Sequence, residues 1–430
     1  MSSSNTPNPL SGIRNEAMST EETNTKVKAK ADAKSQRSFG RQLYDWLSGF
    51  GLATCLLLLM GLLTWFATLE QIDSGLHATL RKYFSWKAWY VLPEIKGKLV
   101  PLPLPGGYWT GALLVVNMTL GGIVRARKGW KHAGNLIAHA GIIFMLIAGG
   151  VAHHFEVRGN MAIEPGKSND TAEDYFEHVV EVTEVDVEGE ISKIHVIRGK
   201  HVMDLVNGRS RIIRLSDLPF DLELAGYILN AKPVHQHEYA PKKGERVVDG
   251  YYLWEEEPEV EAERNTGGCY GRVVFRDGSK SNPFIVSALS FYHHTIEYGG
   301  KHYFVNMRKR LWPMPFELRL DEFTAEFHPG TKRPAKFISE VCRIEGGTES
   351  QITIQMNEPL RYQGLTFYQA SYGPQGAGPD EELFTVLEVV SNPADKWPEY
   401  SLYIVTVGML IAFITKLYQF LAGQARKRAS

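Results

Sequence analysis

Hydrophobic residues along the chain gather into four runs, separated by polar stretches of very different lengths. At 1.5 Å per residue, runs of this size match the roughly 30 Å hydrocarbon core of a bilayer. The pattern predicts four transmembrane helices, over 46–69, 108–124, 133–152 and 399–418. The polar segments between and around them are a head over 1–45, an outer loop over 70–107, a short loop over 125–132, a long block over 153–398 and a tail over 419–430.

The long block over 153–398 has a different pattern. It contains short runs rich in β-branched and aromatic residues, separated by Gly, Asn, Asp and Pro. Residues 178–187, 316–320 and 351–356 alternate between polar and apolar side chains, as half-buried strands do. The predicted fold class is therefore a membrane protein with four transmembrane α-helices and a large all-β domain, a sandwich or open barrel, between spans 3 and 4. Whether the block forms one β domain or two is left open.

Positive charges in the loop over 125–132 set the expected orientation. The positive-inside rule places a loop with such charges in the cytoplasm; here they are Arg125, Arg127, Lys128 and Lys131. Both termini are then cytoplasmic, which agrees with a basic head, expected to be disordered, and a basic tail. The outer loop and the β domain are then extracytoplasmic, in a multi-pass protein of the inner or plasma membrane of the cell.

The outer loop carries an unusual mixture of side chains. Residues 76–90 combine aromatic and basic residues, and Pro and Gly then break the chain before the second span. Such a composition fits a short helix lying at the membrane surface, in contact with lipid.

Composition excludes several classes of function. The formal net charge of −1 gives no support for a nucleic-acid partner. The three cysteines form no Cys-x-x-Cys, so neither a thioredoxin-type redox motif nor a c-type haem attachment site is predicted in this chain. Cys269 and Cys342 could form a disulfide outside the cytoplasm, and this is left open.

His139 is the only ionisable side chain in the third apolar run. A histidine there can ligate haem iron, relay protons or hydrogen-bond a neighbouring helix. From the helix alone, the structural hydrogen bond is as good an interpretation as the other two together. A stripe of small residues beside it predicts that His139 faces protein; its members are Gly134, Ala138, Gly141 and Ala148.

Other histidines are weaker candidates. His153 and His154 lie at the outer mouth of the third span, and His77 lies in the outer loop. They could bind a metal or a ligand with propionate groups, but a solvated interfacial position is favoured. Candidate metal ligands on predicted strands, for which a solvated or core position is favoured, are His235, His237, His293 and His294.

One segment resembles a known family. Residues 357–372 read Asn-Glu-Pro-Leu-Arg-Tyr-Gln-Gly-Leu-Thr-Phe-Tyr-Gln-Ala-Ser-Tyr and closely resemble the hallmark segment of ResB-type cytochrome c biogenesis proteins. Residues 316–323 and 335–339 resemble the stretches upstream of it. The four-span layout is similar, and residues 135–141 resemble the family's third span with its intramembrane histidine.

The resemblance implies a function in System II cytochrome c biogenesis. ResB works with a polytopic membrane protein, ResC or CcsA, to transport haem across the membrane and attach it to Cys-x-x-Cys-His of apocytochrome c. A thiol-reducing thioredoxin-like protein is a further implied partner. The partner's tryptophan-rich signature is absent here, so the chain is expected to be a non-catalytic or co-catalytic subunit of the cytochrome c synthase, a haem lyase, with no catalytic residue of its own.

By the same resemblance, His139 would be an axial ligand of a transient, non-covalent, b-type haem, paired with a histidine of the partner. A haem-reactive cysteine of some members has no evident counterpart, since Cys55 lies within the first span. The alternative is a membrane-anchored scaffold or sensor whose extracytoplasmic β domain binds a ligand or a protein and which needs no special role for His139.

Overall fold

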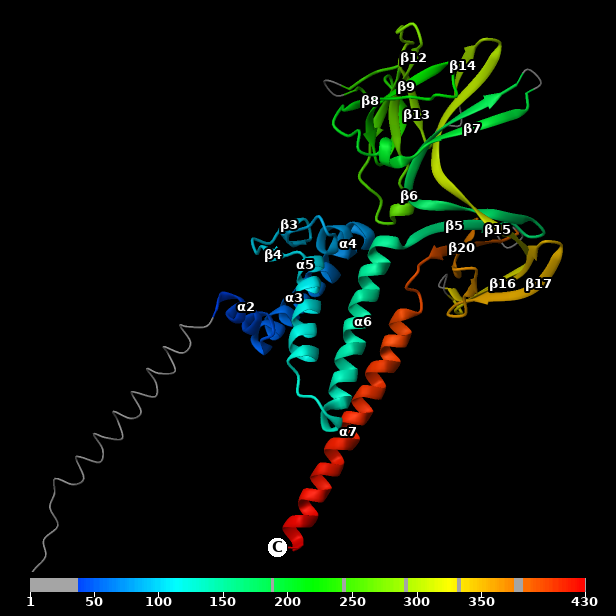
Figure 1. The fold of residues 1–430 in the computed structure, drawn as a ribbon. Coiled ribbons are helices and arrows are strands. Elements are labelled where there is room, and N and C mark those ends of the chain that lie inside the picture. Colours follow the sequence, from blue (N-terminus) through cyan, green and yellow to red (C-terminus); the bar gives the residue numbers. More distant parts are fainter. Residues whose placement is uncertain are drawn as a thin grey trace, which may run out of the picture. The chain divides into compact units, whose positions relative to one another are not determined.

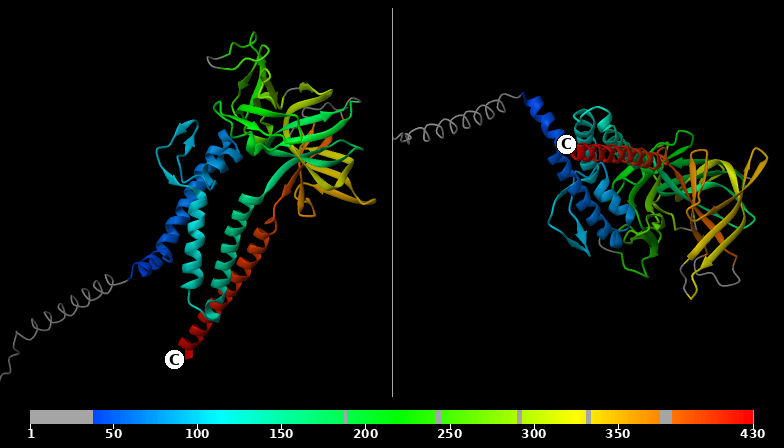
Figure 2. Two further views of the ribbon diagram at one scale, coloured as in Figure 1. Left: turned by 45° about the horizontal axis from the view of Figure 1, so that its top comes forward. Right: turned by 90° about the horizontal axis from the view of Figure 1, so that it is seen from below.

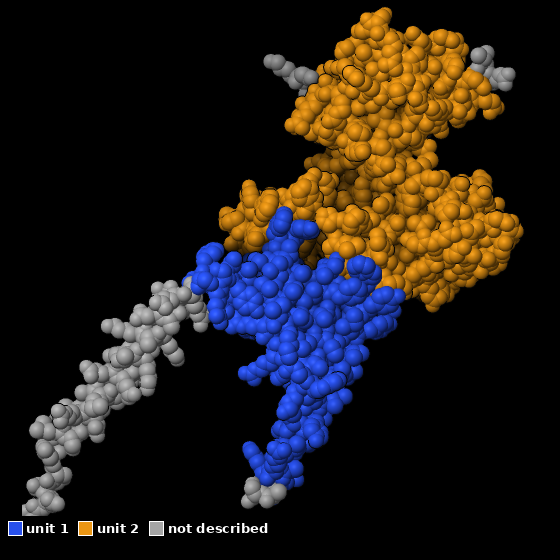
Figure 3. All heavy atoms as spheres, viewed as in Figure 1, with its two compact units in different colours: residues 1–63, 107–147, 397–430 blue, residues 64–106, 148–396 orange. Residues whose placement is uncertain are grey.

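The computed structural model describes residues 38–186, 189–241, 245–289, 293–330, 334–374 and 382–429. Most of the predicted head, residues 1–37, lies outside the described residues. The chain forms two compact units, drawn in different colours in Figure 3. The first comprises 1–63, 107–147 and 397–430, and the second comprises 64–106 and 148–396.

Within the described residues, four helical segments are long and apolar enough to cross a membrane, which confirms the predicted number of spans. They are α3 (Phe50–Ser74), α5 (Gly107–Asn117) with the π-helical segment η1 (Met118–Val124), α6 (Ala133–Phe155) preceded by the short 3-10 turn η2 (Trp130–His132), and α7 (Trp397–Ala429). The last helix continues through the basic residues 426–428 that were expected to lie in a separate tail.

The first span starts later and ends later than the apolar pattern predicts. Helix α2 (Phe39–Leu47) occupies the end of the expected polar head, and a break at Ser48 separates it from α3. The side chain of Asn117 donates hydrogen bonds to the carbonyl oxygens of Leu47 and Gly49, at 2.6 and 3.0 Å. The first bond gives the carbonyl of Leu47 a partner at the break, and the carbonyl of Gly49 also accepts from the amide of Ala53 at 3.3 Å.

Helices α6 and α7 lie side by side (Figures 1 and 2). A methyl group added to Gly134 would lie 2.3 Å from the backbone nitrogen of Ala412, and one added to Gly408 would lie 2.5 Å from that of Ala138. Gly141 faces Val405 in the same way, with 2.7 Å to its side chain. The small-residue stripe predicted on the third span is thus a surface for close contact with the fourth.

The helix and strands of the outer loop are all short. It begins with helix α4 (Leu76–Phe84) and continues as four strands of two residues each, paired β1 with β4 and β2 with β3. These strands are β1 (Tyr90–Val91), β2 (Glu94–Ile95), β3 (Lys98–Leu99) and β4 (Leu104–Pro105).

The second unit is otherwise built mostly from strands, which confirms the predicted β domain. In sequence order they follow α6 and precede α7. Their bounds are β5 (Val157–Ile163), β6 (Ser168–Val185), β7 (Ile191–Ile197), β8 (Ser210–Ile213), β9 (Phe220–Ile228), β10 (Ala231–His235), β11 (Tyr251–Glu255), β12 (Gly268–Phe275), β13 (Phe284–Ser287), β14 (His294–Tyr298), β15 (Lys301–Phe327), β16 (Pro334–Glu345), β17 (Thr348–Gln355), β18 (Leu360–Tyr362), β19 (Leu365–Gly373) and β20 (Phe384–Ser391). Two 3-10 turns, η3 (Gly199–His201) and η4 (Ala262–Arg264), interrupt them.

Two long strands connect two hydrophobic cores. The main sheet has the order β17-β16-β15-β6-β5-β20-β19-β18, with β7 beside β6 and β14 beside β15. The register between β6 and β15 shifts after Lys309, and the two cores lie on either side of this shift. One core includes Leu224 and Val305 beside the four-stranded sheet β13-β12-β9-β8, and the other includes Met161 and Phe367. One compact unit therefore contains two β cores.

The disulfide that the sequence left open does not form in the structure, where Cys269 and Cys342 are both free. Cys269 belongs to the first of the two cores, and its side chain is fully buried. Burial raises the pKa of its thiol to about 12.

Candidate functional site

The imidazole of His139 lies against the backbone of the second span. A methyl group added to Gly122, in η1, would lie 2.7 Å from Cδ2 of His139 and 3.4 Å from Nε2. A separation of 2.7 Å is shorter than any van der Waals contact between carbons, so only glycine leaves room for the ring at this place. The prediction that His139 faces protein is therefore confirmed.

One hydrogen bond assigns the tautomer of the neutral ring. Nδ1 of His139 lies 2.7 Å from the carbonyl oxygen of Asn135, one turn earlier on α6. A carbonyl oxygen only accepts, so Nδ1 donates the proton and Nε2 of the neutral ring keeps its lone pair. Among the residues that the structure describes, Nε2 has no hydrogen-bond partner. This is the form in which histidine coordinates a metal.

The π-helical segment η1 places two successive glycines against two different neighbours. Gly121 lies against Ser48, with 2.7 Å from an added methyl group to its carbonyl oxygen, and Gly122 lies against His139. Arg125, just after η1, donates a hydrogen bond to the hydroxyl of Ser48 at 2.9 Å. π-helical turns within spans are frequent at functional sites. Here the turn brings the break before α3 and the ring of His139 to the same short stretch of the second span.

The two histidines at the outer end of α6 are not part of this arrangement. His153 and His154 have their ring centroids 5.1 Å apart, in an edge-to-face orientation. They lie about 21 Å or more further along the same helix than His139, at 1.5 Å per residue.

His77 has a structural contact in the second unit. Its ring, on α4, stacks on that of Phe176 on β6, with 3.8 Å between centroids. Burial, together with the positive charges of Arg81 and Arg158, lowers the pKa of His77 to about 4. The imidazole is therefore neutral at physiological pH.

The candidate metal ligands are not assembled into a site within the described residues, where no group of three or more His, Cys, Asp or Glu side chains could hold an ion. His235 and His237 are neighbours, with 4.9 Å between their ring centroids. The ring of His294 stacks on Phe284 at 3.8 Å, and that of His293 lies 4.1 Å from Phe304.

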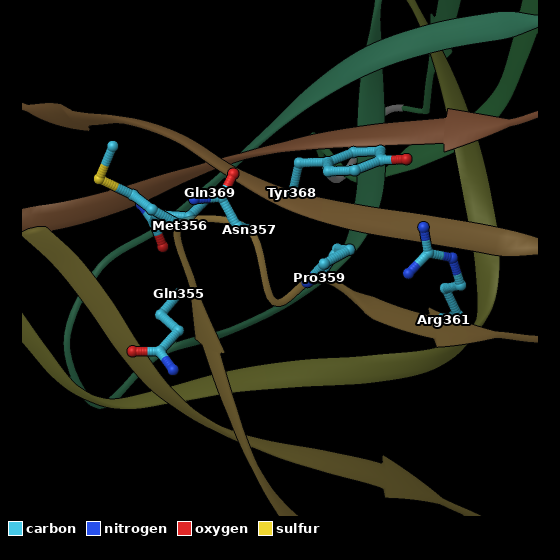
Figure 4. A pocket seen from close by; sticks show the side chains of 7 residues that line it. All are labelled: Gln355, Met356, Asn357, Pro359, Arg361, Tyr368 and Gln369. Carbon is cyan, nitrogen blue, oxygen red and sulfur yellow. The ribbon is translucent and has the colours of Figure 1, made fainter. Parts of the chain in front are cut away.

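The segment over 357–372 forms a pocket that the sequence did not reveal. Its volume is about 410 Å³, and Figure 4 shows Gln355 and Met356 on one side of it and Arg361 and Tyr368 on the other. The remaining lining residues are Asn357, Pro359 and Gln369. A hairpin turn with Asn357 in the left-handed conformation, φ +68°, shapes one wall. The combination of a turn-forming Asn with carboxamide side chains on flanking strands was the signal available in the sequence.

Arg361 connects this pocket to the beginning of the last span. Its guanidinium forms an ion pair with Asp395 at 2.9 Å, and the hydroxyl of Tyr368 lies 3.5 Å from the same carboxylate. Helix α7 begins at Trp397, two residues later. The pocket is therefore linked, through Asp395, to the segment that directly precedes α7 in the sequence.

Similarity to known proteins extends over both the contact of His139 with Gly122 and the segment over 357–372. The model of the ResB-like family matches residues 114–192 and 301–383. The first stretch contains Gly122 and His139, and the second contains the segment over 357–372. Over these two stretches the chain is similar to the ResB-like family. The residues between the two stretches, 193–300, contribute most of the hydrophobic core that contains Leu224 and Val305.

Among curated proteins, this ResB-like chain is similar to Protein NrfI of Wolinella succinogenes. The two are 27% identical over 119 residues, which is 27% of this chain and 12% of NrfI. The chain therefore matches only a small part of the length of that relative.

Proposed function

We propose that this ResB-like protein takes part in cytochrome c biogenesis as a haem-handling subunit. Together with a polytopic membrane protein of the ResC or CcsA type, it would transport haem across the membrane and present it to apocytochrome c. The observation that carries the proposal is the geometry of His139, whose Nδ1 is bound to the carbonyl of Asn135 while Nε2 keeps its lone pair.

The donor set of this chain fits one axial position of haem iron. Neutral imidazole is a common axial ligand, and the hydrogen bond at Nδ1 orients the ring and raises its basicity. His139 is the histidine of the third span that lies away from its ends, and the second axial ligand would come from the partner. Haem is the cargo here, held without a covalent bond.

The depth of His139 favours a loading site over the attachment site. His139 is about 9 Å from the start of α6 and about 24 Å from its end. The loop before α6 carries the positive charges of 125–131 and is cytoplasmic by the positive-inside rule. With the termini also cytoplasmic, the β part is on the outer face of the inner or plasma membrane. Haem made inside the cell would therefore meet His139 early.

Attachment of haem to protein takes place on the outer face, where free thiols of apocytochrome c and a thiol-reducing thioredoxin-like protein are required. The β part of this chain is the element available there. It would support the haem site of the partner or receive the apoprotein.

Replacement of His139 by Ala tests the proposal in cells that depend on this protein for cytochrome c. We expect most of the cytochrome c with bound haem to be lost while the membrane level of the protein is unchanged. His201→Ala, at an exposed histidine of η3, is the matched control and should leave the yield at the wild-type level. A full yield with His139→Ala would refute the ligand role.

One observation favours a second candidate function. The pocket over 355–369, of about 410 Å³, would suit a scaffold or sensor that binds a ligand or a protein segment in its β part. In that case His139→Ala would leave the function of the protein in cells unchanged. Substitution of Arg361 or Tyr368 would abolish that function.

A further inference from the structure

The outer loop exposes several large apolar side chains. Leu76 and Leu80, one turn apart on α4, are 59% and 45% exposed. Trp86, Trp89 and Tyr90 follow directly and are 50%, 69% and 69% exposed. Large apolar side chains that are contiguous and exposed mark a surface that something else covers.

Other side chains of α4 attach this helix firmly to the protein. Thr79 and Tyr83 are buried, and His77 stacks on Phe176. The hydroxyl of Tyr83 donates a hydrogen bond at 2.8 Å to the carboxylate of Glu70, near the end of α3. The exposed face is therefore held in a fixed direction.

Both ends of the loop are tied to the ends of spans. Helix α3 ends at Ser74, and α4 begins two residues later, after Gly75. Gly75 has φ +80°, and a methyl group on it would lie 2.1 Å from the carbonyl oxygen of Val260. This turn fixes the direction of the chain between α3 and α4.

At the other end, β1 pairs with β4 one residue before α5 begins. Tyr90 is opposite Pro105, and the amide of Gly106 donates a hydrogen bond to the carbonyl of Trp89 at 3.0 Å. The next residue, Gly107, is the first of α5. The aromatic residues are therefore held next to the beginning of the second span, on the membrane face from which α3 leaves.

The side chains on this surface match the boundary between headgroups and acyl chains. Trp and Tyr are enriched at that depth, and basic side chains beside them reach anionic headgroups. Arg81 and Lys87 are both exposed, and the ammonium of Lys87 lies 5.6 Å from the centroid of the Trp86 ring. The distribution is that of an amphipathic segment lying in the interface.

We propose that residues 76–90 form a lipid-binding surface that lies in the outer interface of the bilayer. Leu76, Leu80, Trp86, Trp89 and Tyr90 enter the acyl boundary, while Arg81 and Lys87 contact anionic headgroups. This surface does not depend on haem or on His139.

Spin labels at positions 76 and 80 test this surface in the full-length protein. Leu76→Cys and Leu80→Cys are made in a Cys55→Ser background, labelled, and reconstituted in vesicles of phosphatidylethanolamine and phosphatidylglycerol. Accessibility to oxygen is compared with accessibility to a water-soluble nickel chelate. We expect oxygen to exceed nickel at both positions.

Two control sites calibrate the measurement. A label at Leu57, exposed within α3, should show a larger excess of oxygen, and a label at Ser192, exposed on β7, should show an excess of nickel. An excess of nickel at 76 and 80 would overturn the proposal, because the surface would face water. Low accessibility to both reagents would also overturn it, because protein would then cover the surface. The labels should lie less deeply in vesicles that lack phosphatidylglycerol. If their depth is unchanged there, the role given to Arg81 and Lys87 would be overturned.

Discussion

The ring of His139 occupies the space in which any side chain at position 122 would have to lie. The contact joins the third span to the π-helical turn of the second, and a methyl group at Gly122 would approach Cδ2 to 2.7 Å. The side chain that is proposed to bind haem is therefore positioned by a residue without a side chain.

Gly122→Ala should displace the imidazole and lower the haem content of the complex severalfold. The displaced ring loses its hydrogen bond to Asn135 or turns Nε2 away from its present direction. The measurement is haem per protein after purification with the partner. Gly111→Ala, on α5, is the matched control because nothing lies within 4 Å of the added methyl group. Equal haem content in the two variants would show that Gly122 does not set the position of the ring.

Gly134→Ala should weaken the contact between α6 and α7. The added methyl group would lie 2.3 Å from the backbone of Ala412, which cannot rotate away. Overpacking of this kind costs about 1–3 kcal/mol. Unfolding of the purified protein in detergent should shift accordingly, whereas Gly149→Ala, on an open part of the same helix, should leave the transition in place. A wild-type transition for Gly134→Ala would mean that the two helices are not in close contact.

Attachment of α4 to β6 should weaken as the pH falls. Burial and the nearby charges of Arg81 and Arg158 lower the pKa of His77 from 6.5 to about 4. The free segment therefore takes up a proton at a higher pH than the attached one, so the attachment is fully stable above about pH 6.5 and is lost progressively towards about pH 4.

Hydrogen exchange over 76–84, corrected for intrinsic rates, should show faster opening at about pH 5 than at about pH 7. His77→Phe keeps an aromatic ring on Phe176 and removes the titrating group, so its opening should not change between these pH values. The same acid-induced increase in His77→Phe would assign the effect to another group.

Cys269 should resist alkylation in the folded protein. Its thiol is fully buried, and burial raises its pKa to about 12, so very little reactive thiolate forms at neutral pH. Maleimide labelling followed by mass spectrometry should modify Cys269 only after unfolding. Recovery of a peptide pair linked between Cys269 and Cys342 would contradict the structure.

The sequence predicted the elements that depend on local pattern. The four apolar runs correspond to four helices, and the stripe with Gly134 and Gly141 correctly indicated a close helix contact. The break at Ser48 was missed because a two-residue interruption hardly changes the hydropathy of the run. It depends on Asn117, which is distant in sequence and supplies hydrogen bonds to the exposed carbonyls.

Features that depend on long-range pairing could not be predicted. Alternation identified strands, but the use of β6 and β15 in both β cores follows from their pairing and from the register shift after Lys309. The contact between His139 and Gly122 depends on the rotation of two helices about their axes. The pocket at 355–369 arises where one hairpin meets the strands that follow it, and its lining residues separately resemble ordinary turn and strand residues.

The most direct test is the absorption spectrum of the reduced complex, purified with the proposed ResC- or CcsA-type partner. Wild type and His201→Ala should show the bands of a six-coordinate b-type haem at equal haem per protein. His139→Ala should lose the haem or show bands of an altered axial ligation. Identical haem content and band positions in His139→Ala would contradict the assignment of His139 as a haem ligand.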